Sequence, residues 1–178
     1  CIYRLPLDQS IVSPGSHCMS CGAAVRWFDN IPIISWLILR GRCRKCGNGF
    51  SIRYPLVELL TACLLLLLFL RFDISISFAV YALLVVALIV VTFIDFDHQI
   101  IPDEISLSGV ALGFLASFFL PEPGWISSLA GIAVGWGSLA LVFHAYLWLT
   151  GREGMGGGDA KLLAMLGAFL GWIAVPFF

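Results

Sequence analysis

Two aspartates, Asp95 and Asp159, each stand at the border of a long apolar run and are the residues best suited to chemistry. Asp159 lies in the stretch Gly154–Lys161, which reads Gly-Met-Gly-Gly-Gly-Asp-Ala-Lys. Charged side chains at the edge of a membrane-spanning segment are costly to place, so they are functional candidates by default. The glycines allow backbone conformations that are closed to other residues. We expect Asp159 to have a partner, and Lys161 could orient it or meet lipid phosphate.

The chemistry open to two such acids is general acid–base catalysis. Two carboxylates held together where the dielectric constant is low cannot both be ionised cheaply, so the pair shares one proton. One Asp can then act as the base that activates a water, while the protonated Asp polarises a carbonyl, as in aspartic proteases. The alternative function for two such acids in a membrane protein is a proton or ion relay. The remaining acids of these loops are interpreted as solvated or helix-capping groups: Asp97, Asp103, Glu104 and Glu153.

Four cysteines ahead of the apolar runs form two Cys-x2-Cys pairs: Cys18, Cys21, Cys43 and Cys46. Each pair brings two thiolates to one side of a tight turn, so together they offer four soft ligands for tetrahedral zinc. The interval between the pairs is slightly longer than usual, and two disulfides or a redox pair remain the alternative. Disulfides need an oxidising compartment, whereas the basic character of this segment indicates the cytoplasm. We therefore predict a structural zinc, held by the four cysteines, that stabilises a segment too small to build its own core. His17 adjoins Cys18 and could replace a Cys as ligand.

The composition indicates an integral membrane protein. Of the 178 residues, 60% are hydrophobic and 12% are charged, whereas an ordinary soluble domain is about 45–50% apolar and about 25% charged. The net charge of −1 implies no bulk attraction to nucleic acid. We predict an all-α polytopic membrane helix bundle over residues 55–178, preceded by a small tetracysteine zinc-binding cytoplasmic domain over residues 1–54.

Apolar segments long enough to cross a bilayer predict about five spans. Most of the Lys and Arg precede the first span, so residues 1–54 are placed in the cytoplasm by the positive-inside rule. Counting crossings from there puts Asp95 and Asp159 on the same, cytoplasmic, side. The chain begins without a signal peptide and ends inside an apolar run, so we expect a span to be missing at each end. The expected spans are Leu56–Leu70, Phe78–Ile94, Ile105–Leu120, Trp125–Leu149 and Ala160–Phe178.

Glycine pairs in two of the expected spans have spacings that allow helices to approach closely. They are Gly109 with Gly113 and Gly167 with Gly171. The Trp125–Leu149 span also carries Gly131, Gly135 and Gly137.

Several blocks of the sequence closely resemble the type IV prepilin leader peptidases, the membrane aspartic proteases of type IV pilus and type II secretion systems. The cysteine pairs are similar to the family's cytoplasmic tetracysteine motif. Phe93–Asp103 resembles the block that holds the first catalytic Asp, and Gly156–Lys161 resembles the Gly-x-Gly-Asp block that holds the second. Cys1–Pro6 resembles the segment that follows the family's first span. The N-terminal signature of the family is similar to Trp27–Pro32, Ser35–Leu37, Leu39–Gly41 and Ser51–Leu60.

The resemblance implies that Asp95 and Asp159 are the catalytic pair, because the family's first catalytic residue opens its block. It also implies a substrate, the N-terminus of a prepilin or pseudopilin, with a short basic leader followed by a hydrophobic helix in the membrane lipid. The family cuts after a Gly at the cytoplasmic face of the bacterial inner membrane. Many members then methylate the new N-terminal residue with S-adenosylmethionine. No motif marks the methyl-donor site, and Arg53 and Glu58 are only weak candidates for it.

Two rival functions use the same residues. A proton- or ion-coupled membrane transporter could carry the two acids, although transporters place such groups near mid-bilayer between repeated halves, and no repeat is visible here. A non-catalytic assembly protein could use the zinc domain to bind a partner. The predicted function is membrane aspartic endopeptidase and N-methyltransferase acting on prepilins.

Overall fold

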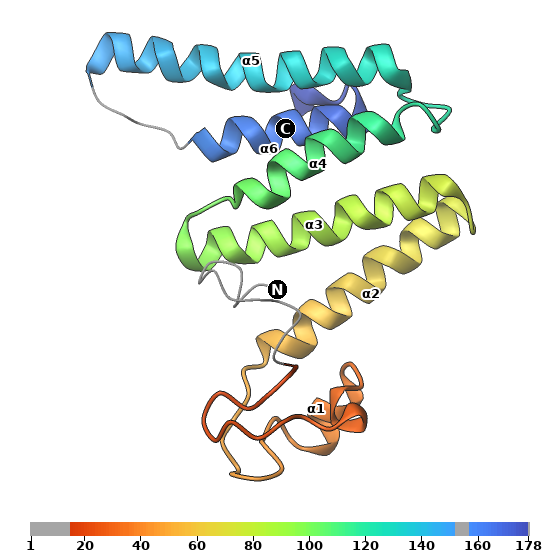
Figure 1. Ribbon diagram of the computed structural model, residues 1–178, viewed down its shortest axis with the longest axis vertical. Coiled ribbons are helices and arrows are strands. Elements are labelled where there is room, and N and C mark those ends of the chain that lie inside the picture. Colours follow the sequence, from red (N-terminus) through yellow and green to blue (C-terminus); the bar gives the residue numbers. More distant parts are fainter. Residues whose placement is uncertain (1–14, 152–156, 178) are drawn as a thin grey trace.

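The computed structural model describes residues 15–151 and 157–177 (Figure 1). Within these ranges the chain is helical and has no β-strand, which confirms the predicted all-α class. The elements are η2 (Trp27–Asn30), α1 (Ile34–Ile38), α2 (Arg53–Phe72), α3 (Ile76–His98), α4 (Asp103–Ala116), α5 (Gly124–Thr150), α6 (Gly157–Leu170) and η3 (Val175–Phe177).

Among the described residues, three helices are long and apolar enough to cross a membrane: α2, α3 and α5, with 20, 23 and 27 residues. No residue of α2 is buried against the rest of the protein, so its leucine-rich surface is free to face lipid. Helices α4 and α6 have 14 residues each, which is about 21 Å at 1.5 Å per residue and shorter than a hydrocarbon core of about 30 Å. The count of five spans therefore stays a prediction.

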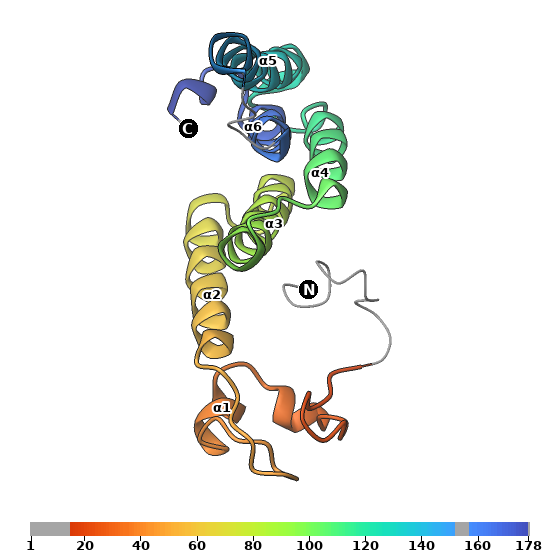
Figure 2. The same cartoon turned by 90° about the vertical axis from the view of Figure 1, so that its left-hand side faces the viewer.

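The tight turn between α2 and α3 makes these two helices antiparallel neighbours. Ser75 caps α3 by accepting a hydrogen bond from the Phe78 N–H at 3.1 Å. Aromatic contacts close the same end, with the rings of Phe72 and Tyr81 stacked 5.1 Å apart. The connection places the C-terminus of α3 beside the N-terminus of α2, at the end of the molecule that carries the cysteine segment (Figures 1 and 2).

Helix α6 is the most enclosed helix of the described bundle, and it packs against both α4 and α5 (Figure 2). Small residues make this possible, because a Cβ on Gly131 would collide with the backbone of Gly167, and a Cβ on Gly135 would lie 2.6 Å from the Leu163 carbonyl oxygen. Ser128 adds a polar contact across the same interface by donating to the Ala168 carbonyl at 2.7 Å. The predicted packing role of Gly167 is confirmed, and Gly131 and Gly135 form the α5 side of the same interface.

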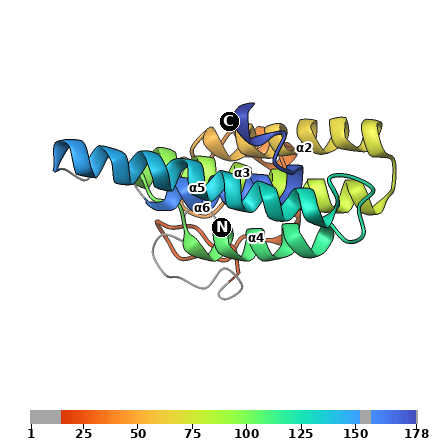
Figure 3. The same cartoon turned by 90° about the horizontal axis from the view of Figure 1, so that it is seen from above.

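The two other faces of α6 use larger side chains. Met165 fills the space left by Gly109 of α4, and Phe169 lies against Gly113. Leu84 of α3 joins Met165 and Phe169 in one buried apolar cluster. A Cβ added to Gly137 of α5, by contrast, would meet none of the neighbouring atoms of the described residues within 4 Å, so helix packing does not require glycine there. The C-terminal end of α5 projects past the other helices (Figure 3).

Helix α6 ends earlier than the sequence predicts. The apolar pattern extends the span to Phe178, but the helix stops at Leu170 and Gly171 takes a left-handed φ of 79°. The Trp172 N–H then donates to the Ser127 carbonyl on α5 at 3.2 Å. A close contact between Gly171 and Ser127 leaves no room for a side chain. The tertiary contact with α5, which hydropathy does not report, therefore decides where α6 stops.

Candidate active site

Asp95 lies near the C-terminus of α3, whereas Asp159 lies near the N-terminus of α6. Asp95 is exposed in the last turn of α3, where its carbonyl accepts from the Gln99 N–H at 2.8 Å and Gln99 takes a left-handed conformation. Asp159 is exposed in the first turn of α6. Residues 152–156, which include the first half of the glycine-rich stretch, lie outside the described residues. Both carboxylates are thus open to water, which hydrolysis of a peptide bond requires.

The loop after α3 brings these two helix ends to the same end of the bundle (Figure 1). A Cβ added to Gly158 would lie 2.9 Å from the Cβ of Ile101. Because contacts that short are essentially never seen, only glycine allows the backbone before Asp159 to pack on this loop. Ile101 follows Asp95 by only six residues in the sequence. The structure therefore brings together the two segments that carry the predicted catalytic acids.

Basic residues pair with two of the acids in the first block. Arg53 at the start of α2 contacts Asp97 at 2.7 Å, and its guanidinium lies 5.2 Å from the centre of the Phe96 ring. Lys161 contacts both carboxylate oxygens of Asp103 at 2.7 Å. Asp97 and Asp103 are exposed, and Asp103 lies in the first turn of α4, as predicted, and each of the two also has a cationic partner. Neither pairing could be read from the sequence, because the partners are far apart in the chain.

The four cysteines of the N-terminal segment form one cluster, as predicted. All four sulfur atoms lie within 4.8 Å of one another, and the group does not include His17. The Sγ atoms of Cys18 and Cys46 are 3.8 Å apart. Tetrahedral zinc with bonds of about 2.3 Å requires sulfurs about 3.8 Å apart. The donor set and its spacing therefore suit a tetrahedral thiophilic metal, and the alternative of two disulfides is not seen, since these cysteines are free thiols.

Two equivalent turns build this cluster. In each turn, the backbone carbonyl of the first Cys accepts a hydrogen bond from the N–H of the glycine that follows the second Cys. The N–O distances are 2.8 Å at Gly22 and 2.9 Å at Gly47. Both glycines adopt a positive φ, of 66° and 71°, a conformation that disfavours other residues. Short antiparallel bridges flank the turns, one of them pairing Arg42 with Gly49. The sequence Cys-x2-Cys-Gly therefore specifies each turn locally.

The electrostatics of the cluster favour thiolates on the first Cys of each pair. The backbone N–H groups of Cys21 and Ser20 lower the pKa of Cys18 to about 6, and those of Cys46 and Lys45 lower the pKa of Cys43. At Cys46 the Asn48 N–H acts in the same direction, but burial and the neighbouring thiols outweigh it and raise the pKa to about 11. Metal binding at neutral pH must therefore displace a proton from Cys46.

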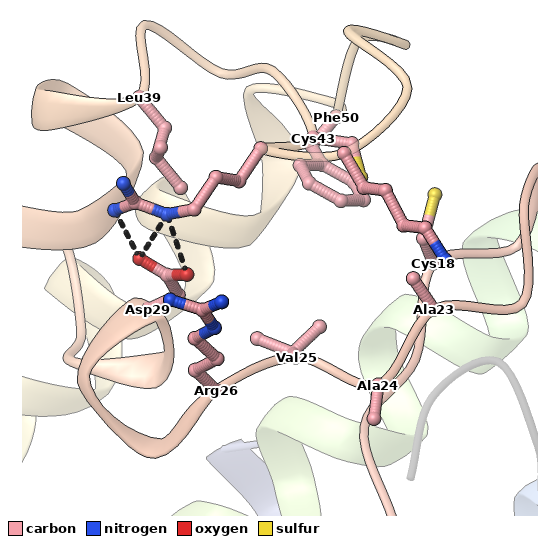
Figure 4. Close-up of a pocket in the computed structure, with 11 residues that line it drawn as sticks. Cys18, Ala23, Ala24, Val25, Arg26, Asp29, Leu39, Cys43 and Phe50 are labelled. Carbon is pink, nitrogen blue, oxygen red and sulfur yellow. Dashed lines mark hydrogen bonds and ion pairs between the residues drawn. The ribbon is translucent and has the colours of Figure 1, made fainter.

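A cavity of about 520 Å³ lies beside the cysteines (Figure 4). Arg26 and Asp29 stand at one end, and Cys18 and Cys43 stand at the other. The carboxylate of Asp29 accepts from Arg44 at 2.7 Å, and this pairing holds the pKa of Asp29 below its usual value. Its other lining residues are Ala23, Ala24, Val25, Leu39, Arg44, Lys45 and Phe50. Sequence reasoning did not find this cavity, because its walls come from both cysteine turns and the segment between them.

Glu58 has a structural contact that the sequence did not reveal. Its Oε2 accepts a hydrogen bond from the Ile33 N–H at 2.7 Å. Ile33 adopts a φ of 62°, which is unusual for a β-branched residue. This bond joins the segment between the cysteine turns to α2. With Arg53 bound to Asp97, both residues considered weakly as methyl-donor ligands are engaged in joining elements of the fold.

Comparison with known proteins gives two family models that divide the chain between α2 and α3. The "Bacterial Peptidase A24 N-terminal domain" model matches residues 1–72, and the "Type IV leader peptidase family" model matches residues 82–178. No solved structure matches the chain.

Curated relatives from several bacteria are similar over nearly the whole chain, and each is named "Prepilin leader peptidase/N-methyltransferase". A Myxococcus xanthus protein is 44% identical over 174 residues, which cover 98% of this chain and 52% of the relative. A Pseudomonas putida protein is 41% identical, with 98% and 62% covered. A Dichelobacter nodosus protein is 41% identical, with 94% and 58% covered. This chain therefore spans about half to three fifths of their length, and it belongs to the type IV leader peptidase family.

Proposed function

We propose that the protein is an aspartic endopeptidase that removes the leader peptide of type IV prepilins or pseudopilins. The observation that carries this proposal is the packing of Gly158 on Ile101, which brings the Asp159 segment to the helix end that bears Asp95. Membership of the leader peptidase family supports the same reaction. The test is loss of the leader from a purified prepilin mixed with the protein in detergent.

The two aspartates would divide the reaction between them. One carboxylate takes a proton from a water, which attacks the scissile carbonyl, while the protonated partner donates to the carbonyl oxygen. The proton then passes to the leaving amine as the tetrahedral intermediate collapses. Both roles require exposed side chains that can meet a substrate strand, and Asp95 and Asp159 are exposed.

The proposed substrate matches the position of these acids at helix ends. A prepilin presents a hydrophobic helix, which would lie in the lipid, and a short basic leader, which would stay in water. The junction between them falls at the membrane interface, where α3 ends and α6 begins. We place this end of the bundle, together with residues 1–54, on the cytoplasmic side of the bacterial inner membrane, since the basic residues concentrate there.

The cysteine cluster is proposed to hold a structural zinc ion. Replacing two ligands in the double variant Cys18→Ser/Cys43→Ser should remove the metal, because two thiolates cannot complete a tetrahedral shell. Metal analysis of the purified protein should show about one zinc per chain in the wild type and none in the variant. Cys63→Ser is the matched control, since Cys63 is an exposed thiol on α2 outside the cluster. Equal zinc in wild type and double variant would contradict the four-thiolate site.

N-methylation of the new N-terminus is proposed as the second activity, with S-adenosylmethionine as the donor of the methyl group. The cavity beside the cysteines fits this molecule in size, since ligand pockets are commonly about 300–1,000 Å³. Arg26 and Lys45 offer cations for the carboxylate of its methionine part, and Phe50 offers an apolar face for its adenine. These residues would hold the donor outside the membrane, where a released substrate N-terminus is accessible.

The variant Arg26→Gln should weaken binding of S-adenosylmethionine about tenfold, because it removes a charge-assisted contact. Equilibrium dialysis with the labelled donor measures this directly, without turnover. Leader cleavage should stay at the wild-type rate, since Arg26 is not near either catalytic aspartate. Arg40→Gln, which removes a cation outside the cavity, should leave binding unchanged. Unchanged binding in Arg26→Gln would remove the cavity from consideration as the donor site.

A further inference from the structure

The ion pair between Asp103 and Lys161 joins the two parts of the candidate active site. Asp103 is the first residue of α4, directly after the loop that follows α3. Lys161 lies on α6, two residues after Asp159. Its Nζ is 2.7 Å from each carboxylate oxygen of Asp103. The pair therefore connects α6, which carries Asp159, to the start of α4, directly after the loop that extends from the Asp95 helix.

This ion pair and the glycine contact hold Asp159 from both sides. Before it in sequence, Gly158 packs on Ile101; after it, Lys161 bonds to Asp103. Ile101 lies in the short connection between α3 and α4, and Asp103 is the first residue of α4. The position of Asp159 relative to the end of α3 is thus set by two contacts, one apolar and one ionic, within a single stretch of four α6 residues.

Stability does not account for the ion pair. The side chains of Lys161 and Asp103 are 33% and 53% exposed, and exposed ion pairs contribute little to folding stability because water screens them. The helix dipole does not account for Lys161 either, since a cation near a helix N-terminus gains nothing from it. Asp103, at the N-terminus of α4, is favourably placed for that dipole. The favourable interaction of Lys161 at this position is its ion pair with Asp103.

We propose that Asp103 and Lys161 are positioning residues that hold Asp159 at the working distance from Asp95. The inference rests on the proposed peptidase function. Neither side chain takes part in proton transfer. Their bond fixes the start of α6 against the α3–α4 connection, so that both carboxylates can reach the same peptide bond. Displacement of a catalytic group by about 1 Å can cost about a hundredfold in rate.

The activity test is a double-mutant cycle with Lys161→Met and Asp103→Asn. Each single variant should lower kcat for leader cleavage about tenfold to a hundredfold, with KM within about twofold of wild type. The double variant should be no slower than the slower single variant, because both remove the same bond. Lys161→Arg should keep most of the activity, since a guanidinium also pairs with a carboxylate. Arg71→Met, which removes an exposed cation at the far end of α2, should cleave at the wild-type rate.

A second measurement separates positioning from stability and from the peptidase function itself. Hydrogen–deuterium exchange of the backbone amides in the first two turns of α6, measured on the full chain, reports how firmly this end of the helix is held. Lys161→Met should speed this exchange several-fold, while the unfolding midpoint moves by no more than about 2 °C. If Lys161→Met speeds the exchange but the wild-type protein never cleaves, the peptidase function is refuted and the contact remains.

Three outcomes would overturn the positioning role. Additive losses in the cycle would show that the residues act separately. An unchanged kcat in Lys161→Met would show that the bond is not needed for alignment. A fall in the unfolding midpoint that parallels the fall in kcat would assign the pair to folding stability.

Discussion

Asp95→Asn and Asp159→Asn should each reduce leader cleavage by about a hundredfold to ten-thousandfold, the usual contribution of a general acid or base. Asparagine keeps the shape of aspartate but can neither accept the proton of the attacking water nor donate one to the carbonyl oxygen. Since the two groups work as a unit, the double variant should be about as slow as the slower single variant. The measurement is the rate at which purified protein in detergent shortens a prepilin, followed by gel or mass spectrometry.

Asp73→Asn is the matched control for these variants. Asp73 is an exposed aspartate at the opposite end of α2, where it has a φ of 49°, a conformation that asparagine also tolerates. It should cleave at the wild-type rate. Asp97→Asn tests whether the first block is assigned correctly, because Asp97 is paired with Arg53 and should lose less activity than Asp95→Asn. Full cleavage by Asp159→Asn would remove the pair from the mechanism, whereas absence of cleavage by the wild-type protein would favour the rival functions.

Gly131→Ala and Gly167→Ala should each destabilise the protein by about 1–3 kcal/mol or more, which makes them the largest expected effects on folding. The new Cβ on either residue meets the backbone carbonyl of the other glycine. Backbone at a helix crossing cannot rotate aside as a side chain can, so α5 and α6 must separate. Separation would also lengthen the Ser128 to Ala168 hydrogen bond that spans the same interface.

Gly137→Ala provides the contrast on the same helix. No atom lies within 4 Å of the position of its Cβ, so the substitution should stabilise α5 by up to about 1 kcal/mol through helix propensity. Thermal unfolding in detergent, followed by circular dichroism, compares the three variants. Equal midpoints for Gly131→Ala and Gly137→Ala would contradict the close crossing of α5 and α6. Because α6 carries Asp159, the destabilised variants should also cleave more slowly.

The sequence by itself determined those features of this protein that depend on short stretches of chain. Apolar length located α2, α3 and α5, because a membrane span needs only one continuous run of suitable residues. The Cys-x2-Cys-Gly pattern determined both cysteine turns, since each turn closes through its own backbone and needs a glycine at a fixed position. The spacing of Gly109, Gly113 and Gly167 predicted close helix packing, which the structure confirms.

The tertiary structure alone decided which groups meet across the chain. It paired Asp103 with Lys161, Asp97 with Arg53, and Glu58 with the Ile33 backbone. It also ended α6 at Leu170, although the apolar pattern continues. Hydropathy and local turn chemistry describe how each segment suits lipid or water, and they carry no information about which charged side chain lies opposite another. Those choices depend on how α6 packs between α4 and α5, and that packing is what brings Asp159 to the end of the bundle that carries Asp95.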